Sequence, residues 1–178
     1  LLLLGCNNKM PIEKEQNTSG AFSFEVLHEK TLSTKRTPTI SGHWKISRPD
    51  IILCNNFITV REVESSIAFW EKIGYKFGKI YEGEQHDECS RDSTPANAIK
   101  ISLPSTDDMS FLRDHLAITI TTRIKATNEI ISASIIMHNF AKNKKLTLEH
   151  EIGHALGWNH TRQSGHIMTP EWKKVGTS

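Results

Sequence analysis

Three histidines and one glutamate near the C-terminal end have the spacing of a metal site. His150 and His154 are four residues apart, so a helix would place both imidazoles on one face, one turn apart. Glu151 directly follows the first histidine, where it can flank the ion without being a ligand, and this is the place of a general base. His160 lies six residues beyond His154, and on a continued helix its ring would point away.

A glycine accounts for the third histidine. Gly157 permits a left-handed turn, so the chain can leave the helix axis and bring His160 to the same ion. Three neutral imidazoles leave one position of a zinc ion open for water, which is typical of catalytic zinc. The pattern predicts that Glu151 takes a proton from zinc-bound water, which attacks a carbonyl, and passes the proton to the leaving amine. The alternative is a helix with incidental histidines.

The arrangement H-E-x-x-H-x-x-G-x-x-H at residues 150–160 resembles that of the metzincin zinc peptidases. Met168, in "GHIMTP", resembles the methionine of the tight turn that lies under the three imidazoles in that family. "HEIGHALG", "IMTP" and Thr161 are most similar to matrixins and their bacterial relatives. The resemblance implies a zinc-dependent endopeptidase with Glu151 as catalytic base, and its metal ligands would be His150, His154 and His160.

The resemblance extends upstream and covers roughly Ile40 to Trp172. It implies that residues 115–124 form the edge strand that receives an extended peptide or protein substrate by main-chain pairing. The alternative for this strand is a plain sheet edge covered by a loop. Ten residues follow Met168, so the wall of the specificity pocket is expected to be short or missing. A non-catalytic, zinc-binding peptide-binding module with an incomplete cleft is therefore the alternative function, and a hydrolase of non-peptide substrates is a weaker third.

The elements that must position these residues can be predicted from the patterns around them. An apolar stripe at helical spacing, formed by Val63, Ile67 and Trp70, predicts a helix. Thr59 would cap its N-terminus. Thr147 would cap the helix that carries the histidines. The expected fold is therefore α/β (α+β): a metzincin-like zincin domain whose twisted mixed sheet has an antiparallel edge strand, with one upstream helix and one active-site helix. The predicted strands lie at 43–47, 50–57, 98–103, 115–124 and 129–140.

The N-terminal residues resemble a bacterial lipobox. "LLGC" at residues 3–6 follows the end of an apolar signal region, so the sequence predicts that Cys6 is lipidated. Residues 1–39 would then be a signal remnant, the lipidated cysteine and a polar tether, and residues 40–178 the catalytic domain. This predicts a membrane-anchored lipoprotein of the bacterial cell envelope, with the outer membrane or surface preferred because Asn7 follows the cysteine. The alternative is a chance leucine run beside an unmodified cysteine.

The composition is that of one globular domain. The chain has 178 residues, 37% hydrophobic and 24% charged, and its net charge of +2 gives no case for a nucleic-acid partner. We expect a monomer. Two further cysteines, Cys54 and Cys89, could form a disulfide in an exported protein or remain two thiols. Because the sequence lacks a first methionine and ends soon after Met168, we expect a longer reading frame.

Overall fold

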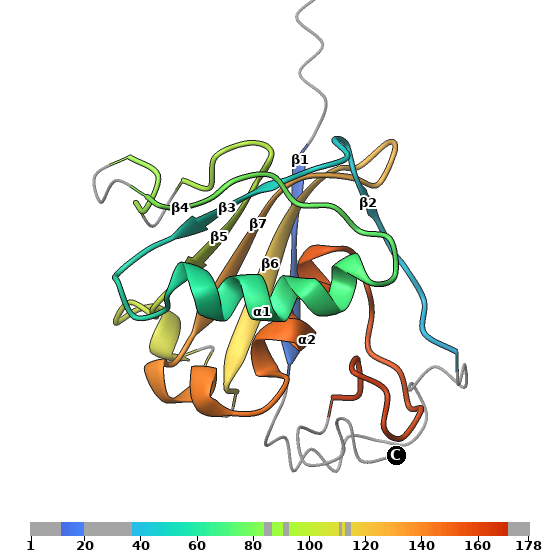
Figure 1. Ribbon diagram of the computed structural model, residues 1–178. Helices are drawn as coiled ribbons and strands as arrows, with labels where there is room; N and C mark the ends of the chain where they lie inside the picture. Colours follow the sequence, from blue (N-terminus) through green and yellow to red (C-terminus); the bar gives the residue numbers. More distant parts are fainter. Residues whose placement is uncertain are drawn as a thin grey trace, which may run out of the picture.

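The computed structural model of the protein describes residues 12–19, 37–83, 87–90, 93–110, 112 and 115–170. Within these residues seven strands form one mixed sheet of order β1-β6-β7-β5-β3-β4, and β2 pairs with β7 off this path (Figure 1). The strands are β1 (Ile12–Ser19), β2 (His43–Trp44), β3 (Asp50–Leu53), β4 (Ile80–Glu82), β5 (Ala98–Ser102), β6 (Ala117–Ile124) and β7 (Glu129–Met137), and the helices are α1 (Val60–Glu71), η1 (Asp108–Ser110), η2 (Asn139–Asn143) and α2 (Thr147–Ala155).

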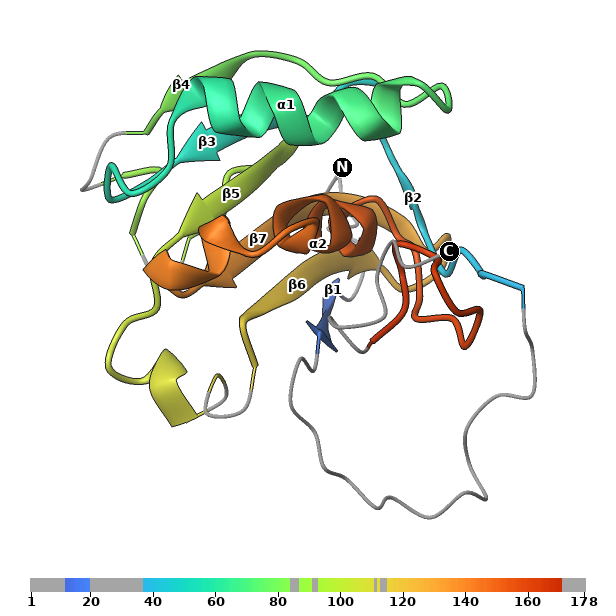
Figure 2. The same cartoon turned by 60° about the horizontal axis from the view of Figure 1, so that its bottom comes forward.

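The sheet is parallel at one end and antiparallel at the other. Strands β4, β3, β5 and β7 run parallel, whereas β6 is antiparallel to both β7 and β1. Helices α1 and α2 lie on the same face of the sheet, with α2 in front of β6 and β7 (Figures 1 and 2). The predicted mixed α/β domain with two helices is therefore confirmed.

Helix α1 begins where the sequence predicts. Thr59 donates its backbone N–H to the Glu62 carboxylate at 2.7 Å, and its hydroxyl accepts the Glu62 backbone N–H at 3.3 Å, so a complete capping box starts the helix. Ile67 and Trp70 are buried on the face toward α2. Gly74 has a φ of 103°, a left-handed conformation that ends the helix without a steric penalty.

A tryptophan ties α1 to α2. The Trp70 side chain is 1% exposed, and its indole N–H donates to the Glu149 carbonyl oxygen in the first turn of α2 at 2.8 Å. Buried Ile99, Ile135 and Ile152 belong to the same core. The apolar face of α1 is therefore held against the helix that carries the histidines and shares one core with the sheet.

Helix α2 does not begin as predicted. Thr147 is its first helical residue rather than its cap, because Leu146, with a φ of 63°, occupies the cap position in a left-handed conformation. The Thr147 backbone N–H already donates to the Lys144 carbonyl at 3.2 Å in the tight turn after η2. Its hydroxyl is buried and has no hydrogen-bond partner in the described part of the chain. The short connection from η2 thus determines where the helix starts.

The predicted edge strand is not at the edge. β6 covers the predicted strand, but β1 pairs with it along its whole length, from Ile12 opposite Ile124 to Ser19 opposite Ala117. β1 comes from the segment that the sequence indicates as a polar tether. Unpaired N–H and C=O groups along a sheet edge favour such addition of a further strand. The predicted lipidation site Cys6 lies outside the described residues.

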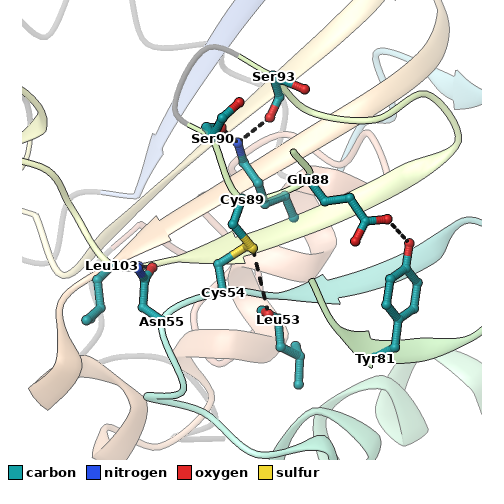
Figure 3. Close-up of a disulfide and its surroundings, with 10 residues drawn as sticks. Leu53, Cys54, Asn55, Tyr81, Glu88, Cys89, Ser90, Ser93 and Leu103 are labelled. Atoms are coloured by element: carbon teal, nitrogen blue, oxygen red, sulfur yellow. Dashed lines mark hydrogen bonds between the residues drawn. A yellow bond between two sulfur atoms is a disulfide. The ribbon is translucent and has the colours of Figure 1, made fainter. Parts of the chain in front are cut away.

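A disulfide stabilises the end of the sheet that contains β3 and β5. Cys54, directly after β3, is bonded to Cys89 with a Cα–Cα distance of 5.6 Å, which decides between the two alternatives for these cysteines (Figure 3). The Lys100 ammonium group on β5 donates to the carbonyl oxygens of Ser90 and Ser93, at 2.8 and 2.5 Å. The loop before β5 is therefore fixed both covalently and by hydrogen bonds. Among the described residues, no helix has the length and apolar character needed to cross a bilayer.

Candidate metal centre

The three histidines point their Nε2 atoms at a common point. The Nε2–Nε2 distances are 3.1 Å between His150 and His154, 3.2 Å between His150 and His160, and 3.0 Å between His154 and His160. Tetrahedral zinc with Zn–N bonds of about 2.0–2.1 Å separates its nitrogen ligands by about 3.3–3.4 Å. The triangle is only a few tenths of an ångström smaller, so these three residues could hold a metal ion of that size.

Backbone carbonyls fix the tautomer that a metal ligand needs. His150 Nδ1 lies 2.6 Å from the Ile167 carbonyl oxygen, and His154 Nδ1 lies 2.8 Å from the Trp158 carbonyl oxygen. A carbonyl oxygen only accepts hydrogen bonds, so each Nδ1 must carry the proton and donate it. Each Nε2 then presents its lone pair to the common point, as metal-bound imidazoles with an outer hydrogen bond do.

Burial keeps the three imidazoles neutral. Desolvation lowers the pKa of His150 to about 4 and that of His154 well below its usual value. The pKa of His160 falls to about 3, chiefly through desolvation and further through the neighbouring His150 and His115. His160 is the most exposed of the three. The three ligands are therefore deprotonated at neutral pH, the form that binds metal.

Gly157 turns the chain so that His160 reaches the other two histidines. It has a φ of 96°, and a methyl group at this position would overlap the carbonyl oxygen of Gly42. The Ser41 backbone N–H donates to the Gly157 carbonyl oxygen at 2.9 Å. The predicted glycine turn is confirmed, and the structure adds a second reason for glycine: the close approach of the segment before β2.

Met168 lies beside the helix that carries His150 and His154. Its side chain is completely buried, and its sulfur lies so close to Gly153 that any side chain there would overlap it. The Thr161 backbone N–H donates to the Met168 carbonyl oxygen at 2.9 Å, and the Met168 N–H donates to His166 Nδ1 at 3.0 Å. A tight turn therefore holds this methionine against the helix of His150 and His154.

Glu151 lies between α2 and β6. Its side chain is 0% exposed, and its Oε2 accepts a hydrogen bond from the Thr119 hydroxyl at 2.6 Å. The same hydroxyl lies 3.2 Å from the Glu151 backbone carbonyl oxygen. Thr119 of β6 thus orients the carboxylate of Glu151, which lies 32 positions later in the chain.

The structure brings the predicted ligands His150, His154 and His160 together, and it places the Glu151 carboxylate at Thr119 and Met168 beside Gly153 of the same helix. Sequence reasoning missed Thr119 and the two carbonyl oxygens of Trp158 and Ile167. The carbonyls carry no side-chain signal and depend only on the course of the chain. Thr119 has a weak signal, since alternation in residues 117–124 places it on the same face as two other polar residues, Thr121 and Arg123.

Comparisons of the chain with protein-family models, with curated proteins and with solved structures gave no match. What is established is therefore the site itself. Among the described residues, His150, His154 and His160 form the one group of three or more potential ligands that could hold a metal ion.

Proposed function

We propose that the protein is a zinc-dependent endopeptidase of the matrixin-like metzincin type. The observation that carries this proposal is the convergence of three Nε2 lone pairs at separations of 3.0–3.2 Å, with Glu151 next to the first ligand. Three imidazoles from one helix and the turn after it leave one side of the ion open. An open position suits catalysis, whereas a structural zinc is enclosed by four protein ligands.

The protein's own groups would move the proton. A bound zinc ion would supply a Lewis acid and lower the pKa of a water molecule at the open position. Glu151 Oε2, oriented by the Thr119 hydroxyl, would accept the proton of the attacking water and then deliver it to the amide nitrogen of the scissile bond. Met168 would support the imidazoles from its buried position beside Gly153.

Cleavage of a denatured protein mixture by the zinc-loaded protein tests the proposal. We expect hydrolysis that a chelator abolishes and that zinc restores. Glu151→Gln should retain zinc and lose activity by about 10²–10⁴-fold. Glu149→Gln, two positions away on the same helix, is the matched control and should stay active. Activity that survives chelation, or that survives Glu151→Gln, would overturn the proposal.

A second function is favoured by a specific observation. Glu151 is completely buried, and β6 is paired with β1 where a substrate would add. These features suit a zinc-binding module that holds a peptide strand without cleaving it. Zinc retention together with no cleavage of a broad peptide library, by the wild-type chain and by variants that release β1, would favour this alternative.

We further propose that the protein is a lipoprotein of the bacterial cell envelope, anchored to the membrane through Cys6. It would be a monomer that acts on extended peptides or proteins and not on nucleic acid. The disulfide between Cys54 and Cys89 supports an oxidising compartment. Metabolic labelling with a palmitate analogue tests the anchor. Label should be incorporated into the wild-type chain and lost in Cys6→Ser, and equal labelling of both would contradict the anchor.

A further inference from the structure

The outer edge of β6 already holds a peptide strand, and that strand belongs to the same chain. β1 pairs with β6 in an antiparallel register of eight residues (Figure 1). On its other side β6 pairs with β7, so within the described residues both of its edges are occupied. A strand added to a sheet edge by main-chain pairing is the mode in which many proteins bind extended peptides.

The paired strand passes beside the proposed catalytic residues. Asn17 of β1 is the pairing partner of Thr119, whose hydroxyl donates to the Glu151 carboxylate. Helix α2, which carries Glu151 and two of the histidines, also contacts β1. Figure 1 shows β1 running beside β6, with α2 in front of this part of the sheet. The backbone near Asn17 therefore lies where a substrate on this edge would approach the carboxylate.

We propose that β1 is an internal competitor that occupies the substrate-binding edge of β6, so that peptides bind only when β1 is displaced. This inference rests on the proposed peptidase function, because it names how that site is regulated. The ligand that competes with β1 is an extended peptide segment. It would replace β1 residue for residue and form the same main-chain hydrogen bonds with β6.

The composition of β1 suits a strand that can leave. Five consecutive residues, from Glu13 to Asn17, are Glu, Lys, Glu, Gln and Asn. Glu, Lys and Asn are depleted in strands, whereas six of the eight residues of β6 are Ile or Thr, which favour them. The sequence of β1 is therefore a weak strand former that pairs with a strong one. A substrate with side chains better suited to a strand offers the same backbone groups and can compete.

Competition of this kind has a kinetic signature. If β1 occupies the edge for most of the time, the apparent affinity for peptide falls by the fraction of molecules in which the edge is open. Release of β1 should therefore lower KM, by about tenfold if the edge is open in about a tenth of the molecules. kcat should not change, because the zinc ligands and Glu151 are the same once the peptide is bound.

A disulfide lock tests the inference in the full-length chain. Lys14 lies directly opposite Thr122 in the β1–β6 register, so Lys14→Cys combined with Thr122→Cys can link the two strands. We expect the oxidised double variant to lose peptide binding and cleavage, and a mild reductant to restore both. Each single variant, treated identically, controls for the added cysteine and for the reductant. Unchanged KM in the locked protein would overturn the inference.

A proline series tests the release of β1 with internal controls. In an antiparallel pair only every second N–H of β1 points at β6, and the others point away. Among Glu13→Pro, Lys14→Pro, Glu15→Pro and Gln16→Pro, alternate members should therefore lower KM by about tenfold while their neighbours do not. An equal effect of all four, or of none, would contradict pairing as the cause.

A binding measurement separates this inference from the proposed function. The zinc-loaded Glu151→Gln chain can be titrated with a labelled extended peptide, with and without the lock. If no variant cleaves any peptide but the lock abolishes binding, the peptidase proposal fails and the competition stands. If peptides are cleaved and bound equally well with β1 locked, the competition fails and the peptidase proposal stands.

Discussion

The two ends of the sheet are stabilised in different ways. At the β3–β5 end, a disulfide joins Cys54 to Cys89, and the buried Lys100 ammonium group fixes the loop by two carbonyl contacts. At the β6 end, three neutral histidines face one another at about 3 Å, held by backbone carbonyls and by a glycine turn. The first end is held by a covalent bond and by hydrogen bonds, whereas the second has three histidines that could hold a metal ion.

This contrast shows how the fold separates stability from chemistry. Packing three imidazoles together and burying them costs free energy, because their polar nitrogens lose water. Burial of Ile51, Ile99, Ile101 and the other core residues must offset this cost. Metal binding should therefore stabilise the β6 end, and changes at the disulfide end should leave the metal site intact. The predictions below separate the two ends.

Zinc should give the largest effect. At a free zinc concentration about 1,000 times the dissociation constant, the free energy of unfolding should rise by about 4 kcal/mol. Denaturant titrations with and without zinc measure it. His160→Ala removes one of the three histidines and should lose most of the zinc-dependent rise in the free energy of unfolding. An equal gain in His160→Ala would mean that zinc binds elsewhere.

Removal of the disulfide should be next in size. Cys54→Ser combined with Cys89→Ser should lower the free energy of unfolding by about 2–4 kcal/mol, since the bond closes a loop between residues 35 positions apart. Zinc affinity, measured by competition with a coloured chelator, should be unchanged. A parallel loss of zinc affinity would show that the two ends are coupled.

Gly153→Ala should damage the metal end. The added methyl group would overlap the Met168 sulfur and come within 2.6 Å of the Trp70 ring, which should cost about 1–3 kcal/mol of stability and weaken zinc binding. Gly74→Ala is a control, because Gly74 has open space around it: there the added methyl group meets only the cost of a positive φ, and zinc affinity should not change. Equal zinc affinity in Gly153→Ala and wild type would refute the packing argument.

Thr119→Val should have a smaller and more selective effect. It removes the hydroxyl that donates to Glu151 but keeps the shape of the side chain. We expect kcat to fall by about tenfold, equivalent to about 1.4 kcal/mol, with zinc affinity unchanged. Thr119→Ser keeps the hydroxyl and should restore most of the rate. A rate that follows side-chain volume instead would point to packing.

Mild acid should have the smallest effect, on zinc affinity. Histidines with the usual pKa of 6.5 would be mostly protonated at pH 5, and each would weaken zinc binding by roughly 30-fold. Burial lowers the pKa of His150 to about 4 and of His160 to about 3, so both remain neutral at that pH. Zinc affinity should therefore be nearly equal at pH 7 and pH 5. A steep loss between these values would contradict the lowered pKa values.

Local patterns predict the parts of this protein that depend on near neighbours. The Thr59–Glu62 capping box, the apolar stripe of α1 and the Gly157 turn depend on residues a few positions apart, and the structure has all three. The convergence of His150, His154 and His160 also follows from spacing along one helix and one turn. These features could be read from the sequence because the interactions that form them are local.

Long-range pairing explains what the sequence did not indicate. Nothing in the polar segment 12–19 marks it as the partner of β6, because main-chain pairing does not depend strongly on side chains. The Thr119–Glu151 contact requires the packing of a helix on a strand. The start of α2 was wrong by one residue because the turn at Leu146 depends on η2 and not on the capping preference of Thr147.

The contact between Ser41 and Gly157 has a consequence for the order of events during folding. These residues are 116 positions apart, and the turn that delivers His160 rests on the segment before β2. The third ligand should therefore arrive only after distant parts of the chain have met, which is a late step in the folding of a mixed sheet. We expect tight zinc uptake in the last phase of refolding, as followed with a zinc indicator. Such a protein would acquire its metal only as a finished molecule.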